Sequence, residues 1–141
     1  AAGGDVTTDH VNALLKEMAD SGAPFTNAVI FANAHNKQRL SEIYEYVPES
    51  RTVGGSNIQT IMTDFASLGI VYDRHMPTDE VYIIDLAYCK PHFLNVPDKG
   101  HFFMEPLAKT GAAEKWQLYG EIGLEYGPEQ WHGSVTGTST A

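Results

Sequence analysis

The sequence predicts an α+β fold, and three stretches carry that prediction. Residues 8–19 place apolar side chains at helical spacing, residues 28–31 form a short continuous apolar run typical of a buried strand, and residues 114–126 alternate between apolar and polar side chains. We therefore expect a mixed helix-and-sheet unit over residues 8–94, followed by a second part over residues 95–141 that contains a long β-hairpin.

The first predicted helix begins near Thr8 and ends before Gly22. Either Thr8 or Asp9 can cap its first turn, and Gly22 followed by Pro24 stops its last one. One stripe of this helix is apolar, and it consists of Val11, Leu14, Leu15, Met18 and Ala19.

A second helix is predicted directly after the buried strand at residues 28–31. Asn33 can cap this helix, and Pro48 ends it because proline has no amide hydrogen to donate. Between these residues, helical spacing is kept by Leu40, Ile43, Tyr44 and Val47. Residues 51–56 are expected to form a loop.

Strand patterns follow this loop. Residues 58–65 and 68–72 are expected to pair as a hairpin, and residues 81–86 supply a further strand. Residues 92–94 can add a short edge strand, because the neighbouring Pro91 cannot donate to a ladder.

The last long regular pattern in the sequence is the alternating segment at residues 114–126. Its apolar face consists of Trp116, Leu118, Ile122, Leu124 and Tyr126, and its polar face of Lys115, Gln117, Glu121 and Glu125. We expect the apolar face to be covered, with Trp116 and Tyr126 packed into a core. Residues 131–136 are expected to return antiparallel to this strand after a turn at Gly127 and Pro128.

Composition and charge exclude some classes of partner. The chain has 141 residues and a formal net charge of −9, and its nine Lys and Arg residues are scattered singly. Binding to nucleic acid or to an anionic membrane surface needs clustered positive charge, and a membrane span needs about 20 consecutive apolar residues. We therefore expect no specific nucleic-acid binding and no membrane association.

The sequence contains no recognisable catalytic or metal-binding motif. Its six histidines do not stand at zinc-ligand spacing, and its single cysteine, Cys89, lies between apolar stretches, where a thiol is expected to be buried and reduced. Gly54-Gly55 lacks the lysine of a phosphate loop, and no nucleophile elbow surrounds Ser134. We expect no metal, no cofactor and no enzymatic activity.

Several short motifs occur in a characteristic order. They are Arg51-Thr52-Val53-Gly54, Asp73-Arg74-His75-Met76-Pro77, Asp85-Leu86-Ala87-Tyr88, Glu105-Pro106-Leu107-Ala108-Lys109-Thr110-Gly111 and His132-Gly133. This succession resembles the C-terminal part of a group of tailed-bacteriophage and prophage major capsid proteins with the Hong Kong 97-like fold. The similarity covers most of the chain from about Val11 onward.

The resemblance implies both a fold and a function. Residues 8–94 would form an axial domain around the capsomer axis, and residues 95–141 a returning part of a peripheral domain. Family members are usually longer, with an N-terminal arm, an extended loop and a long spine helix ahead of these parts. We therefore expect this chain to be a fragment or a processed product of a longer subunit.

The implied partner is the protein itself, in hexamers and pentamers of an icosahedral shell that encloses the genome. Scaffolding or decoration proteins are further candidate partners. The implied location is the virion, after assembly in the cytoplasm of the bacterial host. The resemblance also implies residues at subunit interfaces. We expect them in two polar segments that contain glycine and that we expect to be surface loops. The interface residues are Arg51, Thr52, Gly54, Glu105, Lys109 and Thr110.

Two other classes of function compete with a capsid subunit at this point. A small α+β unit with an open face can bind a peptide or a glycan. A hydrolase can use scattered carboxylates such as Asp73, Asp79 and Glu80, which share one predicted loop with Arg74. Particle size in solution separates self-assembly from both alternatives.

Overall fold

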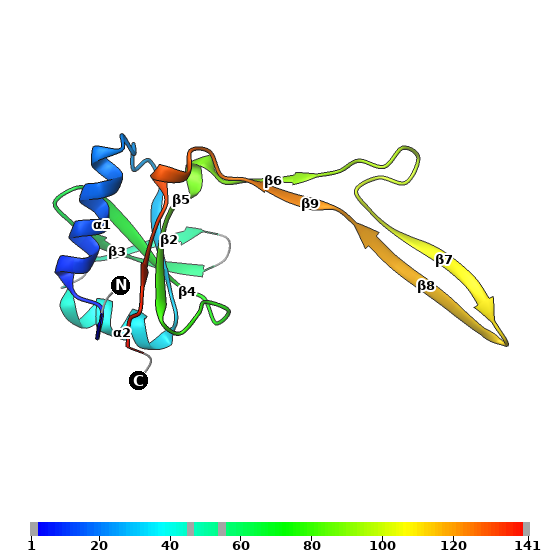
Figure 1. Ribbon diagram of the computed structural model, residues 1–141, viewed down its shortest axis with the longest axis horizontal. Helices are drawn as coiled ribbons and strands as arrows, with labels where there is room; N and C mark the ends of the chain where they lie inside the picture. The colour runs from blue at the N-terminus through cyan, green and yellow to red at the C-terminus, as the bar shows by residue number, and fades with distance from the viewer. Residues whose placement is uncertain (1–2, 45–46, 54–55, 140–141) are drawn as a thin grey trace. The chain divides into compact units, whose positions relative to one another are not determined.

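The protein folds into two compact units, which we describe separately (Figure 1). The structure is a computed structural model that describes residues 3–44, 47–53 and 56–139, with the backbone alone described for residues 47–53 and 56–59. The sheet unit consists of Ala1–Tyr88 and Gly127–Ala141, and the ribbon unit of Cys89–Tyr126.

The sheet unit is built on one six-stranded sheet. From one edge to the other the strands are β10 (Gly133–Thr136), β5 (Glu80–Asp85), β1 (Ala28–Ala32), β4 (Ser67–Tyr72), β3 (Ser56–Met62) and β2 (Val47–Val53). The central strand β1 runs parallel to β4 and antiparallel to β5, and the other neighbours are antiparallel. The apolar run at residues 28–31 is therefore a central strand, as its continuous hydrophobicity predicted.

Two helices pack on this sheet (Figure 1). Helix α1 (Thr8–Asp20) is capped by Thr7, whose hydroxyl accepts a hydrogen bond from the His10 amide, so the predicted cap at Thr8 or Asp9 is wrong by one or two residues. Helix α2 (Ala34–Ile43) is capped by Asn33, as predicted, since the Asn33 side chain accepts from the Asn36 amide at 2.8 Å.

The core lies between the helices and the sheet. Helix α1 contributes the predicted stripe residues Val11, Leu15 and Met18, and α2 contributes Leu40. The sheet contributes Ile30, Ala32, Ile61, Leu68, Ile70, Val81 and Ile83, all nearly inaccessible to solvent. Apolar burial on this scale makes the sheet unit a folded body with its own core.

Two sequence-based expectations fail between α2 and β3. Helix α2 ends at Ile43, with Tyr44 in an extended conformation, so the helix does not continue to Pro48. Residues 51–53 and Ser56 are not a loop, because they belong to β2 and β3, which pair with each other. Pro48 is compatible with β2 because β2 is the edge strand of the sheet.

The ribbon unit consists of two antiparallel strand pairs. Strand β6 (Lys90–Phe93) pairs with β9 (Ile122–Glu125), and β7 (Phe102–Thr110) pairs with β8 (Ala113–Gly120). The predicted long strand at 114–126 is therefore two strands, which are separated at Glu121. Its expected pairing with residues 131–136 is wrong, because β10 pairs with β5 in the sheet unit.

Several contacts close the sheet unit where the chain leaves and re-enters it. Two short 3-10 helices, Leu86–Tyr88 and Glu129–Trp131, lie at these points. The Tyr88 and Trp131 rings meet edge to face with centroids 4.6 Å apart. Gly127, at a φ of +68°, lies against Tyr88, whose Cβ would be 3.3 Å from a Cβ added at this glycine.

Hydrogen bonds join residues near both ends of the described chain, and one of them reaches the start of α2. Thr138 is buried, and its hydroxyl accepts a hydrogen bond from the Asn36 side-chain amide at 3.0 Å. The backbone amides of Thr138 and Ser139 donate to Asp79 and Gly4, respectively, and Gly4 bridges to Thr138. Residues near both ends of the described chain are thus part of one hydrogen-bonded cluster.

Candidate interaction surface

The most unusual surface of the protein is an apolar face on the ribbon unit. Cross-strand partners in a ladder point to the same side. On β7 and β8, one side carries the pairs Phe102–Gly120, Met104–Leu118 and Pro106–Trp116. On β6 and β9, one side carries the pairs Pro91–Leu124 and Phe93–Ile122. We call the nine non-glycine residues of these pairs the apolar face: Pro91, Phe93, Phe102, Met104, Pro106, Trp116, Leu118, Ile122 and Leu124.

The apolar face has two parts, because the two strand pairs are separate two-stranded sheets that meet near Glu121. After the Phe93–Ile122 pair, the Leu94 amide donates a hydrogen bond to the Glu121 carbonyl at 3.1 Å. The second sheet begins with the Phe102–Gly120 pair, and residues 95–101 connect β6 to β7.

The whole apolar face is exposed to solvent. Phe102 and Ile122 are each 68% exposed, and Trp116 is 57% exposed. The expectation that Trp116 and Tyr126 pack in a core of this chain is therefore wrong. The alternating pattern correctly identifies a one-sided apolar strand, but the described chain supplies no cover for it.

Gly120 lies at one end of the β7–β8 part of this face. A Cβ at Gly120 would lie 2.5 Å from Cδ2 of Phe102, so the Phe102 ring occupies the space that a side chain at position 120 would need. Glycine in a strand costs stability, and an aromatic ring laid over it compensates for part of the lost side-chain packing.

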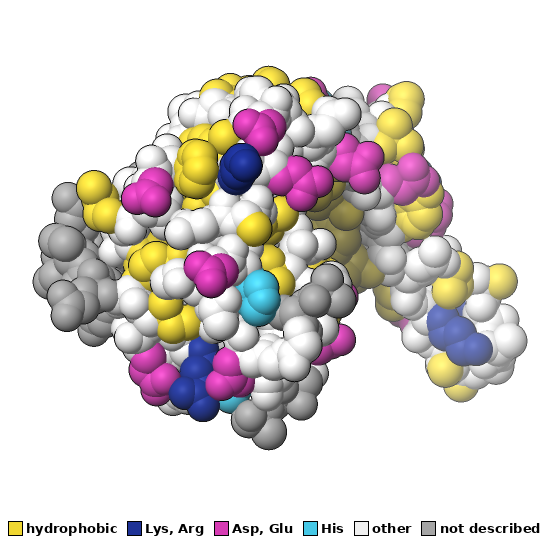
Figure 2. All heavy atoms as spheres, turned by 60° about the vertical axis from the view of Figure 1, so that its left-hand side comes forward, with side chains coloured by type: hydrophobic (Ala, Val, Ile, Leu, Met, Phe, Trp, Pro, Cys, Tyr) yellow, Lys and Arg dark blue, Asp and Glu magenta, His cyan; other side chains and the backbone are white. Residues whose placement is uncertain are grey.

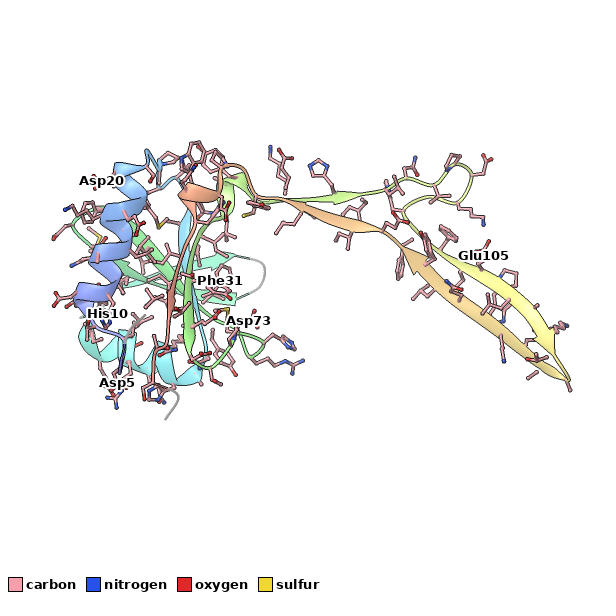
Figure 3. The ribbon with its side chains drawn as sticks, in the orientation of Figure 1. Asp5, His10, Asp20, Phe31, Asp73 and Glu105 are labelled. Carbon is pink, nitrogen blue, oxygen red and sulfur yellow. The ribbon has the colours of Figure 1, made fainter. Side chains whose placement is uncertain are left out.

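The opposite sides of the two sheets carry most of the charged side chains, together with the exposed Leu94 and Leu107. His92 and Glu125 are 2.5 Å apart, and this hydrogen bond, followed by the charge of His92, lowers the pKa of Glu125. Lys99 forms an ion pair with Glu105 and lies 4.9 Å from the centre of the Phe103 ring. Side chains of β7 that include Glu105 stand out from the ribbon in Figure 3.

Charge is divided unequally between the two units. The ribbon unit has four Lys and five Asp or Glu residues, a net −1, which leaves −8 of the total −9 on the sheet unit. Figure 2 shows acidic side chains spread over one face of the sheet unit with few Lys or Arg between them. Copies of the sheet unit therefore repel one another at low ionic strength, whereas the ribbon unit is nearly neutral.

Five of the six predicted interface residues lie on strands rather than loops. Arg51 and Thr52 are in β2, and Gly54 lies outside the described residues. Glu105, Lys109 and Thr110 are in β7, so the expectation of a surface loop at residues 105–110 is wrong. Lys109 forms an ion pair across the hairpin with Glu114 at 2.8 Å. Whether these six residues contact another subunit remains a prediction.

Sequence reasoning missed the part of the apolar face that lies on β7. It identified the strand that carries Trp116 and Leu118, but not Phe102, Met104 and Pro106 on β7. The signal was present, since these three residues alternate with Phe103 and Glu105, but Pro106 and the glycine that follows the motif favoured a loop.

The described part of the chain contains no cluster of side chains suited to a metal ion. Among these residues, no group of three or more His, Cys, Asp or Glu side chains is arranged to hold a metal ion. Their helices also include none with the length and hydrophobicity needed to cross a membrane.

Comparison with known proteins identifies the family. The model of the SU10 major capsid protein family matches residues 1–139, which is nearly the whole chain. No curated protein matches the chain. The match agrees with the resemblance that the sequence motifs indicated and with the mixture of helices and sheet. The chain therefore belongs to the SU10 major capsid protein family, which makes it a structural subunit of a bacteriophage capsid.

Proposed function

We propose that copies of this chain close into hexamers and pentamers and that these rings form an icosahedral shell around the phage genome. Membership of a major capsid protein family supports this proposal, because a shell is built from many copies of one subunit. Ring contacts are heterologous: one surface of each copy meets a different surface of the next, and the ring closes when the rotation permits.

The proposed architecture is Hong Kong 97-like. We assign the sheet unit to the axial domain and the ribbon unit to the returning part of the peripheral domain. This assignment differs from the division at residue 94 that the sequence predicted. The reason is that β10 pairs with β5, which joins the C-terminal residues to the sheet unit. The mixed α+β character of the sheet unit is compatible with this assignment.

The proposed location is the virion, with assembly in the host cytoplasm and with scaffolding or decoration proteins as further partners. The ring contacts are proposed to include Arg51, Thr52, Gly54, Glu105, Lys109 and Thr110. Of these, Lys109 offers the sharpest test, because its ion pair with Glu114 lies within one hairpin.

The shell proposal is tested by the size of the purified protein. Sedimentation velocity and electron microscopy are expected to show hexamers, pentamers or closed particles whose yield rises with protein concentration. A single-chain species at every concentration would contradict ring formation.

The interface role of Lys109 is tested by two variants. Lys109→Glu is expected to lower particle yield without changing the far-UV circular dichroism spectrum. The double variant Lys109→Glu with Glu114→Lys restores the ion pair inside the hairpin. If Lys109 contacts a neighbouring subunit, the double variant does not recover particle yield. Full recovery would assign Lys109 a role within its own hairpin.

A further inference from the structure

Helix α2 is docked on the sheet by a small number of buried side chains. Of its ten residues only Asn36 and Leu40 are buried, and the partly buried Ile43 adds to this contact. Isolated helices shorter than about 12–15 residues are marginal in water, so α2 depends on its tertiary contacts. Because one of its two buried side chains is a polar amide, hydrogen bonds decide whether this helix stays docked.

Residues 137–139, which we call the strap, reach Asn36 from the end of β10. Gly137 turns the chain there with a φ of +75°. Thr138 is buried, and its hydroxyl accepts a hydrogen bond from Nδ2 of Asn36 at 3.0 Å. The Thr138 backbone amide donates to the Asp79 carbonyl at 2.9 Å. The strap therefore fastens the first turn of α2 to the segment that leads into β5.

The strap also fastens the N-terminal segment, residues 4–6. The Ser139 amide donates a hydrogen bond to the Gly4 carbonyl at 2.9 Å, and Val6 is buried in the core. The Asp5 carboxylate lies 3.2 Å from Nε of Arg39 on α2, and Figure 3 shows Asp5 beside this helix. The strap, the N-terminal segment and α2 thus contact one another in all three pairs.

The buried amide of Asn36 is only partly satisfied. Its Nδ2 donates to the Thr138 hydroxyl and also lies 3.4 Å from the Thr78 carbonyl. Among the described residues, however, no donor reaches its Oδ1. A buried polar atom without a partner costs free energy. Docking of α2 therefore carries a cost that the hydrogen bonds of the strap offset.

We infer that the strap controls a local opening of the sheet unit. With the strap in place α2 and residues 4–6 are docked, and with the strap displaced they leave the sheet together. Proteins open in such cooperative units at free energies below that of global unfolding. Helix α1 stays folded on the sheet in this opening, because it buries three apolar residues of its own and takes no part in the hydrogen bonds named above. The inference goes beyond the proposed shell and applies equally to a single chain and to a ring.

Hydrogen exchange measured by mass spectrometry tests this opening in the full chain. Thr138→Val removes the hydroxyl that accepts from Asn36 and keeps the shape of the side chain. It is expected to speed amide exchange in α2 and in residues 4–6 by about tenfold and to leave exchange in β1 and β5 unchanged. The matched control is Thr136→Val at an exposed position of β10, where no change is expected in any of these segments.

Three results of this experiment would overturn the inference. Unchanged exchange in α2 would mean that the strap does not hold the helix. Equal acceleration in α2, β1 and β5 would mean that the strap stabilises the whole sheet unit and controls no local opening. Faster exchange in α2 alone would mean that residues 4–6 are fastened independently of the helix.

Asn36→Leu supplies a second test, because a leucine of similar size docks α2 by apolar burial and leaves no amide for the strap to bind. In the Asn36→Leu background, Thr138→Val is expected to change exchange in α2 by less than about twofold. An effect of about tenfold in this background would mean that the Thr138 hydroxyl acts through another partner, and it would overturn the role assigned to the Asn36–Thr138 bond.

Discussion

Replacing Asp85 by alanine removes a carboxylate that holds three backbone amides at the end of β5. Its oxygens accept hydrogen bonds from Thr26 at 2.8 Å, from Asn27 at 3.0 Å and from Ala87 at 3.1 Å. Asp85 is 1% exposed, so water cannot readily replace it. The residue ties the segment before β1 to the point where the chain turns toward the ribbon unit.

The expected cost follows from these bonds. A hydrogen bond to a charged group contributes about 1.5–3 kcal/mol, and the loss is smaller where the freed amides are only partly buried. Asp85→Ala is therefore expected to lower the free energy of unfolding by about 3–4 kcal/mol, and Asp85→Asn by about half as much, since one oxygen remains to accept.

Urea denaturation followed by circular dichroism measures this difference. The matched control is Asp73→Ala, because the Asp73 carboxylate also accepts a backbone amide, that of His75 at 2.8 Å, but does so at an exposed turn. We expect Asp73→Ala to cost less than about 1 kcal/mol. Equal losses for the two alanine variants would refute the structural role assigned to Asp85.

Three further predictions concern packing, pH and salt. Gly133→Ala is expected to cost about 1–3 kcal/mol in thermal unfolding, because its Cβ would lie 2.6 Å from Cδ1 of Leu14; an unchanged melting temperature would contradict this contact. His92→Ala is expected to raise the pKa of Glu125 in an NMR titration, since His92 lowers this pKa. The contribution of the His92–Glu125 pair to stability is present at neutral pH and is lost as the pH falls through the Glu125 pKa. Identical titrations of Glu125 in the parent protein and the variant would contradict the pair. The yield of rings is expected to rise with salt concentration, because added salt screens the net charge of −8 on each sheet unit. The Debye length falls from about 30 Å at 0.01 M salt to about 8 Å at 0.15 M. A ring yield that falls with salt would contradict repulsion between sheet units.

The sequence predicted those elements whose pattern reflects burial within the chain. The α1 stripe, the central strand β1 and the Asn33 cap of α2 all follow from local spacing, and the structure confirms them. Each of these residues finds its packing or hydrogen-bond partner in the sheet unit. Local pattern and tertiary structure agree there, which is the usual condition for a successful prediction.

The failures have three causes, of which the first is the presence of proline in strands with an unpaired side. Pro48 and Pro106 favoured a helix end and a loop, yet both lie in strands with one unpaired side, where a missing amide hydrogen is tolerated. The pairing of β10 was missed because a four-residue strand gives no signal of its partner. The cover of the Trp116 face was misjudged because alternation reports that a strand is one-sided, not which molecule covers it.

The close approach of Tyr88 and Gly127 allows the length of the ribbon unit to change without changing the sheet unit. Because the chain leaves and re-enters the sheet unit at adjacent points, the ribbon behaves as an insertion whose length is independent of the core. Extra residues at the Gly111 turn would lengthen it and leave the existing pairs in place. The connection at residues 95–101 lies between the two strand pairs, so extra residues there would also leave the existing pairs in place. A single residue inserted within a paired strand would instead reverse every side chain beyond it, unless it were absorbed as a bulge. Related chains are therefore expected to differ in ribbon length chiefly at these two turns.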